Sequence, residues 1–167
     1  MSFASKLGKS YESVKDQAKI KKITIELGEV KFDLKVRIPL KSEMEELLEK
    51  IASPAEEKVQ EIYVKLSQGI KTAIDEGGEE FLKVVNADKE TIKVLEDDIV
   101  VDGTSIRQVA TMTAVNEVQV EEYFHLLQSE TGEPITESYA DISAEFPEQV
   151  IKEIIAQIDS AIRPDHK

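Results

Sequence analysis

The side chains of this sequence that could do chemistry are carboxylates and two histidines, because the chain contains no cysteine. The lack of cysteine excludes disulfides, thiolate metal sites and cysteine nucleophiles. His125 lies in the apolar run 123–127, where a packed histidine is favoured over a catalytic base, since no motif names a nucleophile nearby. His166 stands apart, within the last three residues. Two isolated histidines do not predict a zinc site.

The acidic segment 97–103 is the strongest candidate for a calcium loop. Placing Gly103 at loop position six puts Asp98 at position one and Asp102 at position five. Position three is then Val100 and position twelve is Val109. A calcium loop requires a liganding carboxylate at position twelve, which valine cannot supply. The test fails, and a hairpin turn explains this segment better.

Phosphate and cofactor motifs are also missing from the sequence. There is no Walker loop and no dinucleotide glycine fingerprint, and acids that would repel phosphate flank the pair Gly77-Gly78. Paired carboxylates such as Glu121-Glu122 are common, but neighbouring residues on a helix point apart. The sequence therefore predicts a protein that is not an enzyme, with no catalytic residue, no cofactor and no metal.

Charge is distributed unevenly along the chain. The sequence has 21 Lys and Arg against 34 Asp and Glu, a net charge of −13. Residues 1–41 carry ten bases and five acids, so this head is +5 and the remainder is −18. Such an acidic body repels nucleic acid and favours basic partners, although solvated helix faces alone would explain it. The alternative to solvated faces is that the basic head packs on the acidic body, within one chain or between copies.

Length and composition indicate one soluble globular domain after an N-terminal arm. The chain has 167 residues, 41% hydrophobic and 33% charged. No apolar run approaches the ~20 residues of a membrane span, and the first residues lack a signal peptide, so the expected compartment is the cytoplasm with no membrane partner. We predict a basic amphipathic arm over 1–19 and a single globular domain over 20–167, made of a hairpin at 21–38 and a helical body at 42–164.

The hairpin is the clearest local signal. Apolar residues alternate on both sides of Gly28-Glu29, a two-residue loop whose first position suits a type II′ turn. This loop pairs Leu27 with Val30 and Ile25 with Phe32, placing the apolar side chains on one face. On the other face it pairs Glu26 with Lys31.

Helix signals fill most of the rest. In the first half we expect an arm helix at 3–18 weakened by Gly8, a helix at 42–51 capped by Ser42, and a helix from 53 to Gly77-Gly78 with a short continuation. A second, weaker hairpin at 91–101 is closed by Asp102-Gly103, and a helix capped by Thr104 or Ser105 then runs to 128. A short helix near 136–143 and a last helix from Pro147 to 164 complete the chain. The predicted fold class is α+β and predominantly helical, with an N-terminal hairpin packed on about five helices.

In this order, the segments resemble the tail assembly chaperones of long-tailed bacteriophages and prophages. The resemblance rests on the basic arm followed by ITIELGEVKFDLKVRIPL, on SEMEELLEKI at 42–51, on DDIVVDGTSIRQVA at 97–110 and on EYFHLLQSETGEPI at 122–135. The resemblance is one of size, acidity, order of elements and local sequence over most of the chain. This family has no invariant catalytic motif.

The resemblance implies a chaperone that binds the tape-measure protein and keeps it soluble while the tail tube assembles around it. Such proteins act in the host cytoplasm and are absent from the finished particle. A frameshifted, C-terminally extended form often recruits the tail-tube protein, although nothing in this sequence shows a frameshift. The family has no defined site residues to carry over.

The residues themselves suggest where a partner would bind. A tape-measure chain presents long apolar helical stripes, so its chaperone needs apolar surface within an acidic envelope. The candidate surface lies between the end of the predicted helix that runs to residue 128 and the last predicted helix. It comprises Tyr123, Phe124, Leu127, Ile151, Ile155, Ile158 and Ile162. The alternative is that these residues form the core, since amphipathic helices usually bury their stripe.

Two other functions stay open. A structural tail component, such as a tube or completion subunit, predicts more strand and retention in the finished particle. A DNA mimic, in which carboxylates imitate phosphates, predicts binding that weakens steeply with salt. The basic arm and the strong apolar stripes count against mimicry.

Overall fold

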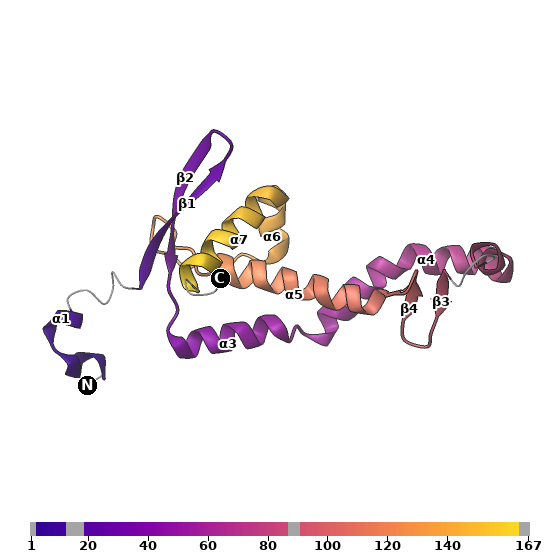
Figure 1. The fold of residues 1–167 in the computed structure, drawn as a ribbon, viewed down its shortest axis with the longest axis horizontal. Helices are drawn as coiled ribbons and strands as arrows, with labels where there is room; N and C mark the ends of the chain where they lie inside the picture. The colour runs from indigo at the N-terminus through magenta and orange to yellow at the C-terminus, as the bar shows by residue number, and fades with distance from the viewer. Residues whose placement is uncertain (1–2, 13–18, 87–90, 164–167) are drawn as a thin grey trace. The chain divides into compact units, whose positions relative to one another are not determined.

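The computed structural model describes residues 3–12, 19–86 and 91–163 (Figure 1). Its contacts group the chain into two compact units. One unit is Met1–Glu49 with Gln119–Lys167, and the other is Lys50–Val118. Each is described by itself below, so the single domain over 20–167 stays a prediction. The predicted fold class is confirmed: the chain is α+β and predominantly helical, with an antiparallel hairpin near its N-terminus.

The hairpin of the first unit has the predicted register. Strand β1 (Ile20–Leu27) pairs with β2 (Val30–Arg37), and Leu27 faces Val30 across the turn. Gly28 has φ +62°, the positive value that a type II′ turn needs at its first position. On the outer face, the ammonium of Lys31 lies 3.3 Å from the carboxylate of Glu26.

A short segment after helix α5 extends this sheet at its base. The predicted helix to residue 128 ends at Phe124, because the chain then leaves the helix to pair with β2. Leu127 forms an isolated bridge with Val36, and Arg37 N–H donates to the carbonyl of Leu126. The extension of the helix through 128 was wrong because backbone pairing with a distant strand outweighed local helix preference.

The predicted arm helix is broken. Residues Ala4–Leu7 form a 3₁₀ turn (η1) and Lys9–Glu12 form one helical turn (α1). Gly8 between them has φ +94°, which a continuing α-helix does not allow. The remainder of the predicted arm helix, residues 13–18, lies outside the described residues.

Three helices complete the first unit around the hairpin. Helix α3 (Lys41–Ala52) begins one residue before the predicted cap Ser42, and the Glu43 carboxylate accepts from the Leu40 N–H at 3.4 Å. Helix α6 (Tyr139–Glu145) begins with a capping box between Ser138 and Asp141. Helix α7 (Glu148–Ile162) packs against β1 and buries the predicted stripe: Ile151, Ile154, Ile158, Ala161 and Ile162.

The core of this unit joins α7 to the end of helix α5 (Ile106–Phe124). Tyr123 is fully buried, and its hydroxyl donates to Asp159 at 2.7 Å. Arg163 Nε donates to the same carboxylate at 2.9 Å. Burial raises the pKa of the Tyr123 phenol, and the hydrogen bond to Asp159 adds to this, so the phenol stays protonated and keeps its donor.

The second unit combines a long kinked helix with a small sheet. Helix α4 (Glu56–Val85) consists of two helices joined by a kink at Gly78, whose φ of +58° and ψ of −148° are not helical. The predicted end at Gly77-Gly78, followed by a short continuation, is therefore confirmed. Strands β3 (Ile92–Val94), β4 (Ile99–Val101) and β5 (Thr104–Ser105) form an antiparallel sheet. The turn Asp102-Gly103 therefore lies between β4 and β5, one strand beyond the predicted hairpin.

The start of α5 confirms the cap predicted at Thr104 or Ser105. Ser105 Oγ accepts from the Gln108 N–H at 3.1 Å, as an N-cap residue does. Further along this unit, Tyr63 is buried and Arg107 lies over its ring, 4.1 Å from the centroid. In the part of the chain that the structure describes, no helix is long and apolar enough to cross a membrane.

Candidate functional site

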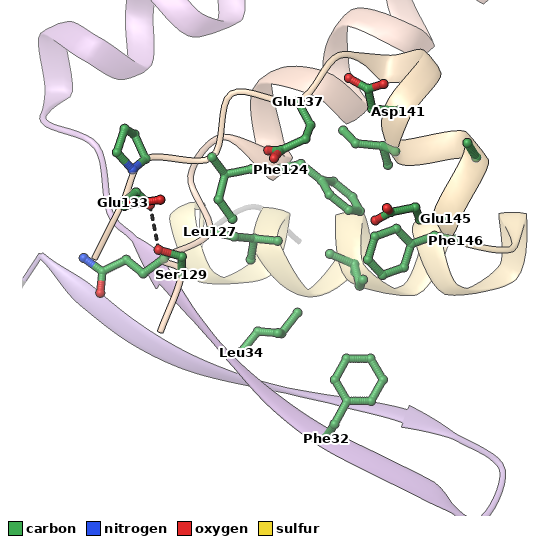
Figure 2. Close-up of a pocket in the computed structure, with 16 residues that line it drawn as sticks. Phe32, Leu34, Phe124, Leu127, Ser129, Glu133, Glu137, Asp141, Glu145 and Phe146 are labelled. Carbon is green, nitrogen blue, oxygen red and sulfur yellow. Dashed lines mark hydrogen bonds between the residues drawn. The ribbon is translucent and has the colours of Figure 1, made fainter. Parts of the chain in front are cut away.

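An apolar groove in the first unit is the best candidate for a functional site. It has a volume of about 590 Å³ and lies between the hairpin, the end of α5 and helix α6 (Figure 2). We call it the apolar groove, and its apolar lining includes Phe32, Leu34, Phe124, Leu127, Ile142 and Phe146. Figure 2 shows Phe32 and Leu34 projecting from the hairpin toward the helices.

The hairpin supplies one wall because its apolar face is only partly covered. On β1, Ile23 and Ile25 are buried, with 5% and 0% of their surface exposed. Their cross-strand partners on β2, Leu34 and Phe32, are half-buried and line the groove. Because side chains alternate along a strand, these four side chains lie on the same face of the hairpin. On that face, the β1 side chains are buried in the core and the β2 side chains line the groove.

The opposite wall is fixed by an aromatic pair. The rings of Phe124 and Phe146 meet edge to face, with centroids 5.7 Å apart and planes at 70°. Phe146 follows α6 directly, and its N–H donates to the carbonyl of Ile142. The edge-to-face contact ties the end of α6 to the buried end of α5.

Carboxylates border this groove along α6. Glu137, Asp141 and Glu145 follow one another at four-residue spacing, all exposed, and Figure 2 places them on the α6 side of the opening. We call these three residues the acidic ridge. Glu133 adds a fourth carboxylate, and no lysine or arginine belongs to the described lining. An apolar floor beside such a ridge suits an amphipathic segment that carries basic residues along its edge.

The structure places the predicted partner-binding residues mainly in the core. Phe124 and Leu127 do line the groove. Tyr123, Ile151, Ile158 and Ile162 are at most 8% exposed, and Ile155 is half-buried and outside the described lining. The alternative raised from the sequence therefore describes these five better, because α7 buries its stripe against the hairpin and α5.

Sequence reasoning missed most of the groove. The alternating pattern predicts that Phe32 and Leu34 lie on the apolar face of the hairpin, but it does not indicate what covers that face. Ile142 and Phe146 lie in a short element whose apolar residues show no strong period. The available signal was the four-residue spacing of Glu137, Asp141 and Glu145. It puts Asp141 and Glu145 on one side of a short helix, with Glu137 just before its cap Ser138.

The two groups weighed for catalysis or calcium have structural roles. His125 Nε2 lies 2.8 Å from the carbonyl oxygen of Glu137 and so anchors the loop before α6. The Asp98 carboxylate accepts from the N–H groups of Ile99 and Arg107, at 2.8 and 2.9 Å, and from the hydroxyl of Ser105. Burial opposes ionisation of Asp98, but these hydrogen bonds outweigh it and hold its pKa below the ordinary value.

Among the residues described, no group of three or more acidic or histidine side chains is arranged to hold a metal ion. No protein family, no curated protein and no solved structure matches the chain. The arguments for function below therefore rest on this chain's own residues and on the resemblance found in its sequence.

Proposed function

We propose that this protein is a non-catalytic tail assembly chaperone of a long-tailed phage or prophage. It binds the tape-measure protein and keeps it soluble during tail-tube assembly. The resemblance of the sequence motivates this proposal, and the apolar groove is the observation that carries it.

The groove has the chemistry that a helical client would require. Its floor offers aromatic and aliphatic side chains that can receive one apolar stripe of a helix, the usual way that a groove holds an amphipathic helix. The acidic ridge beside this floor would pair with lysine or arginine at the edge of that stripe. The chain's net charge of −13 keeps copies of a client-loaded complex apart.

The proposal extends to partners and location. The tape-measure protein is the principal partner, and the tail-tube protein is recruited through an extended form of the chaperone. Both interactions take place in the host cytoplasm, and the protein is absent from the mature virion. Mass spectrometry of purified particles tests the last point: tail-tube peptides without peptides of this chain are expected. Stoichiometric recovery of this chain would favour a structural tail component.

The first test is co-expression with the tape-measure protein of the same phage or prophage, followed by size-exclusion chromatography in moderate salt. We expect the tape-measure protein to be insoluble alone and to elute with this chain in a joint peak. Apolar binding persists in moderate salt, whereas a DNA mimic would bind nucleic acid enzymes only at low salt. A tape-measure protein that stays insoluble, with no joint peak, contradicts the chaperone function.

A groove variant locates the binding surface. Leu34→Glu puts a carboxylate on the half-buried hairpin wall of a groove whose border is already acidic, so it is expected to abolish the joint peak. Met112→Glu is the matched control, because Met112 is 62% exposed on α5 and does not belong to the described lining. Thermal melts of both variants establish that they fold. A folded Leu34→Glu variant that still co-elutes would place the binding surface elsewhere.

A further inference from the structure

The N-terminal arm carries three exposed apolar side chains that the described part of the chain does not bury. Phe3 is 76% exposed and Leu7 is 61% exposed, and Tyr11, at the same spacing, is 38% exposed. Lys6 and Lys9 lie between these residues and are also exposed. This arm, residues 3–12 of the described chain, is therefore a short segment with exposed apolar anchors and exposed basic neighbours.

The apolar groove offers the complementary surface. Its floor is aromatic and aliphatic, its border carries Glu133 and the acidic ridge, and its described lining includes no base. An isolated chain thus leaves two surfaces open: an apolar segment with lysines, and an apolar groove with carboxylates. Pairing them removes apolar area from water and brings opposite charges together.

We propose that the N-terminal arm of one copy of this chain docks in the apolar groove of a second copy. Phe3, Leu7 and Tyr11 enter the groove, and Lys6 and Lys9 face Glu137 and Glu145 of the acidic ridge. Because each copy has one arm and one groove, two copies exchange arms about a twofold axis and make the same contact twice. In this dimer, the exposed apolar side chains of each arm are buried in the groove of the other copy.

This inference goes beyond the proposed function and is tested with the chain alone, so the two can fail separately. Because it places the arm in the groove proposed for the client, a bound client would displace the arm. The test is sedimentation equilibrium of the full-length protein over a range of concentrations. We expect a monomer–dimer equilibrium that shifts toward monomer as salt rises, because the lysine–carboxylate contacts lie at the exposed edge of the groove. A monomer at every concentration would overturn the proposal, including the case in which the arm docks on its own chain.

A charge swap makes the test specific. One variant reverses the arm with Lys6→Glu and Lys9→Glu, and the other reverses the ridge with Glu137→Lys and Glu145→Lys. Alone, each variant meets like charge at both contacts, and its dimer is expected to weaken at least about tenfold. Mixed in equal amounts, the reversed arm meets the reversed ridge and the native arm meets the native ridge, so a mixed dimer is expected to return.

Controls separate this contact from general charge effects. Glu45→Lys with Glu49→Lys matches the ridge reversal on exposed positions of α3, and Lys65→Glu with Lys83→Glu matches the arm reversal on α4. No ion pair is described for the four control residues within the described ranges, and both control proteins should dimerise like the native chain. Variants that dimerise normally when reversed, or a mixture that fails to restore the dimer, would overturn the proposal.

The apolar part of the contact has its own variant. Phe3→Ala with Leu7→Ala removes two anchors that are already exposed, so the fold of the monomer should not change. The dimer is expected to weaken at least about tenfold, since hydrophobic anchors dominate such contacts. Val84→Ala with Met112→Ala, also exposed in the monomer, is the control. Dimerisation that is unaffected by loss of Phe3 and Leu7 would rule out the arm as the docked segment.

Discussion

Helix α5 is held at each end by an aspartate, and the two aspartates work differently. At its start, Asp98 accepts from two backbone N–H groups and from the hydroxyl of Ser105. At its end, Asp159 accepts from the Tyr123 hydroxyl and from Arg163, both side chains. The partners of Asp98 lie within nine residues of it along the chain, whereas Tyr123 and Asp159 are 36 residues apart.

The difference separates a local cap from a core anchor. Asp98 fixes the backbone where β5 leads into the helix, and its negative charge interacts favourably with the positive end of the helix dipole. Asp159 accepts the hydrogen bond of a fully buried phenol, so removing it takes away the acceptor of that O–H group in the core. The core anchor should therefore be the more costly to break.

The largest effect is expected for Asp159→Ala. This variant removes the acceptor of the Tyr123 hydroxyl and the partner of the Arg163 guanidinium, and should lower the free energy of unfolding by about 3 kcal/mol. Urea denaturation measures the change. Asp159→Asn keeps an acceptor for the phenol and should lose distinctly less. Equal losses for the two variants would show that the charge, and not the acceptor, dominates at this end.

The second effect is expected for Asp98→Ala, at about 2 kcal/mol. It removes a helix cap together with the acceptor of the Ile99 N–H and the Ser105 hydroxyl. Asp97→Ala is the matched control, because Asp97 contributes its backbone carbonyl, which accepts from Arg107 Nε at 2.6 Å, and its side chain is exposed. A control as unstable as Asp98→Ala would mean that the segment, and not the cap, was disturbed.

A smaller effect is expected for Tyr123→Phe. The ring stays in the core and only the hydroxyl is lost, while Arg163 continues to pair with Asp159, so the cost should be about 1 kcal/mol. Tyr139→Phe serves as the control, since no hydrogen bond of its hydroxyl is described. Combining Tyr123→Phe with Asp159→Ala should cost less than the sum of the two, because both break the same hydrogen bond. Full additivity would argue against the anchor.

The contrast between local and distant partners also explains what the sequence could predict. The register of the hairpin and the cap at Ser105 follow from neighbouring residues, and both were predicted correctly. The pairing of Leu127 with Val36 joins positions about 90 residues apart, and helix preference near residue 127 gave no sign of it.

The same limit applies to the predicted partner-binding surface. The stripe of α7 was visible in the sequence, but which of its residues stay uncovered depends on the hairpin and on α5. Phe32 and Phe146 come to line one groove although they lie more than 100 residues apart, so no spacing rule relates them. Phe124 and Leu127 were found because they close the same apolar run, not because their environment could be inferred.

The last and smallest effect concerns the response of the Asp98 cap to acid. The folded-state pKa of Asp98 lies below its ordinary value of 3.8, so the unfolded chain binds this proton more tightly. The stability from its charge is therefore complete above about pH 5 and is lost as the pH falls through 3.8 toward the folded-state pKa.

Asp98→Asn isolates this contribution, because asparagine resembles the protonated acid and does not titrate. The pKa of Glu43 is also lowered, chiefly by its hydrogen bond with Arg37, so the native protein alone would report both carboxyls. Subtracting the free energy of unfolding of Asp98→Asn from that of the native chain removes Glu43 from the comparison. We expect this difference to be constant from pH 7 to 5 and to shrink below pH 4, as measured by urea denaturation at each pH. A difference that stays constant at low pH would mean that the cap depends on hydrogen-bond geometry alone and owes nothing to the charge of Asp98.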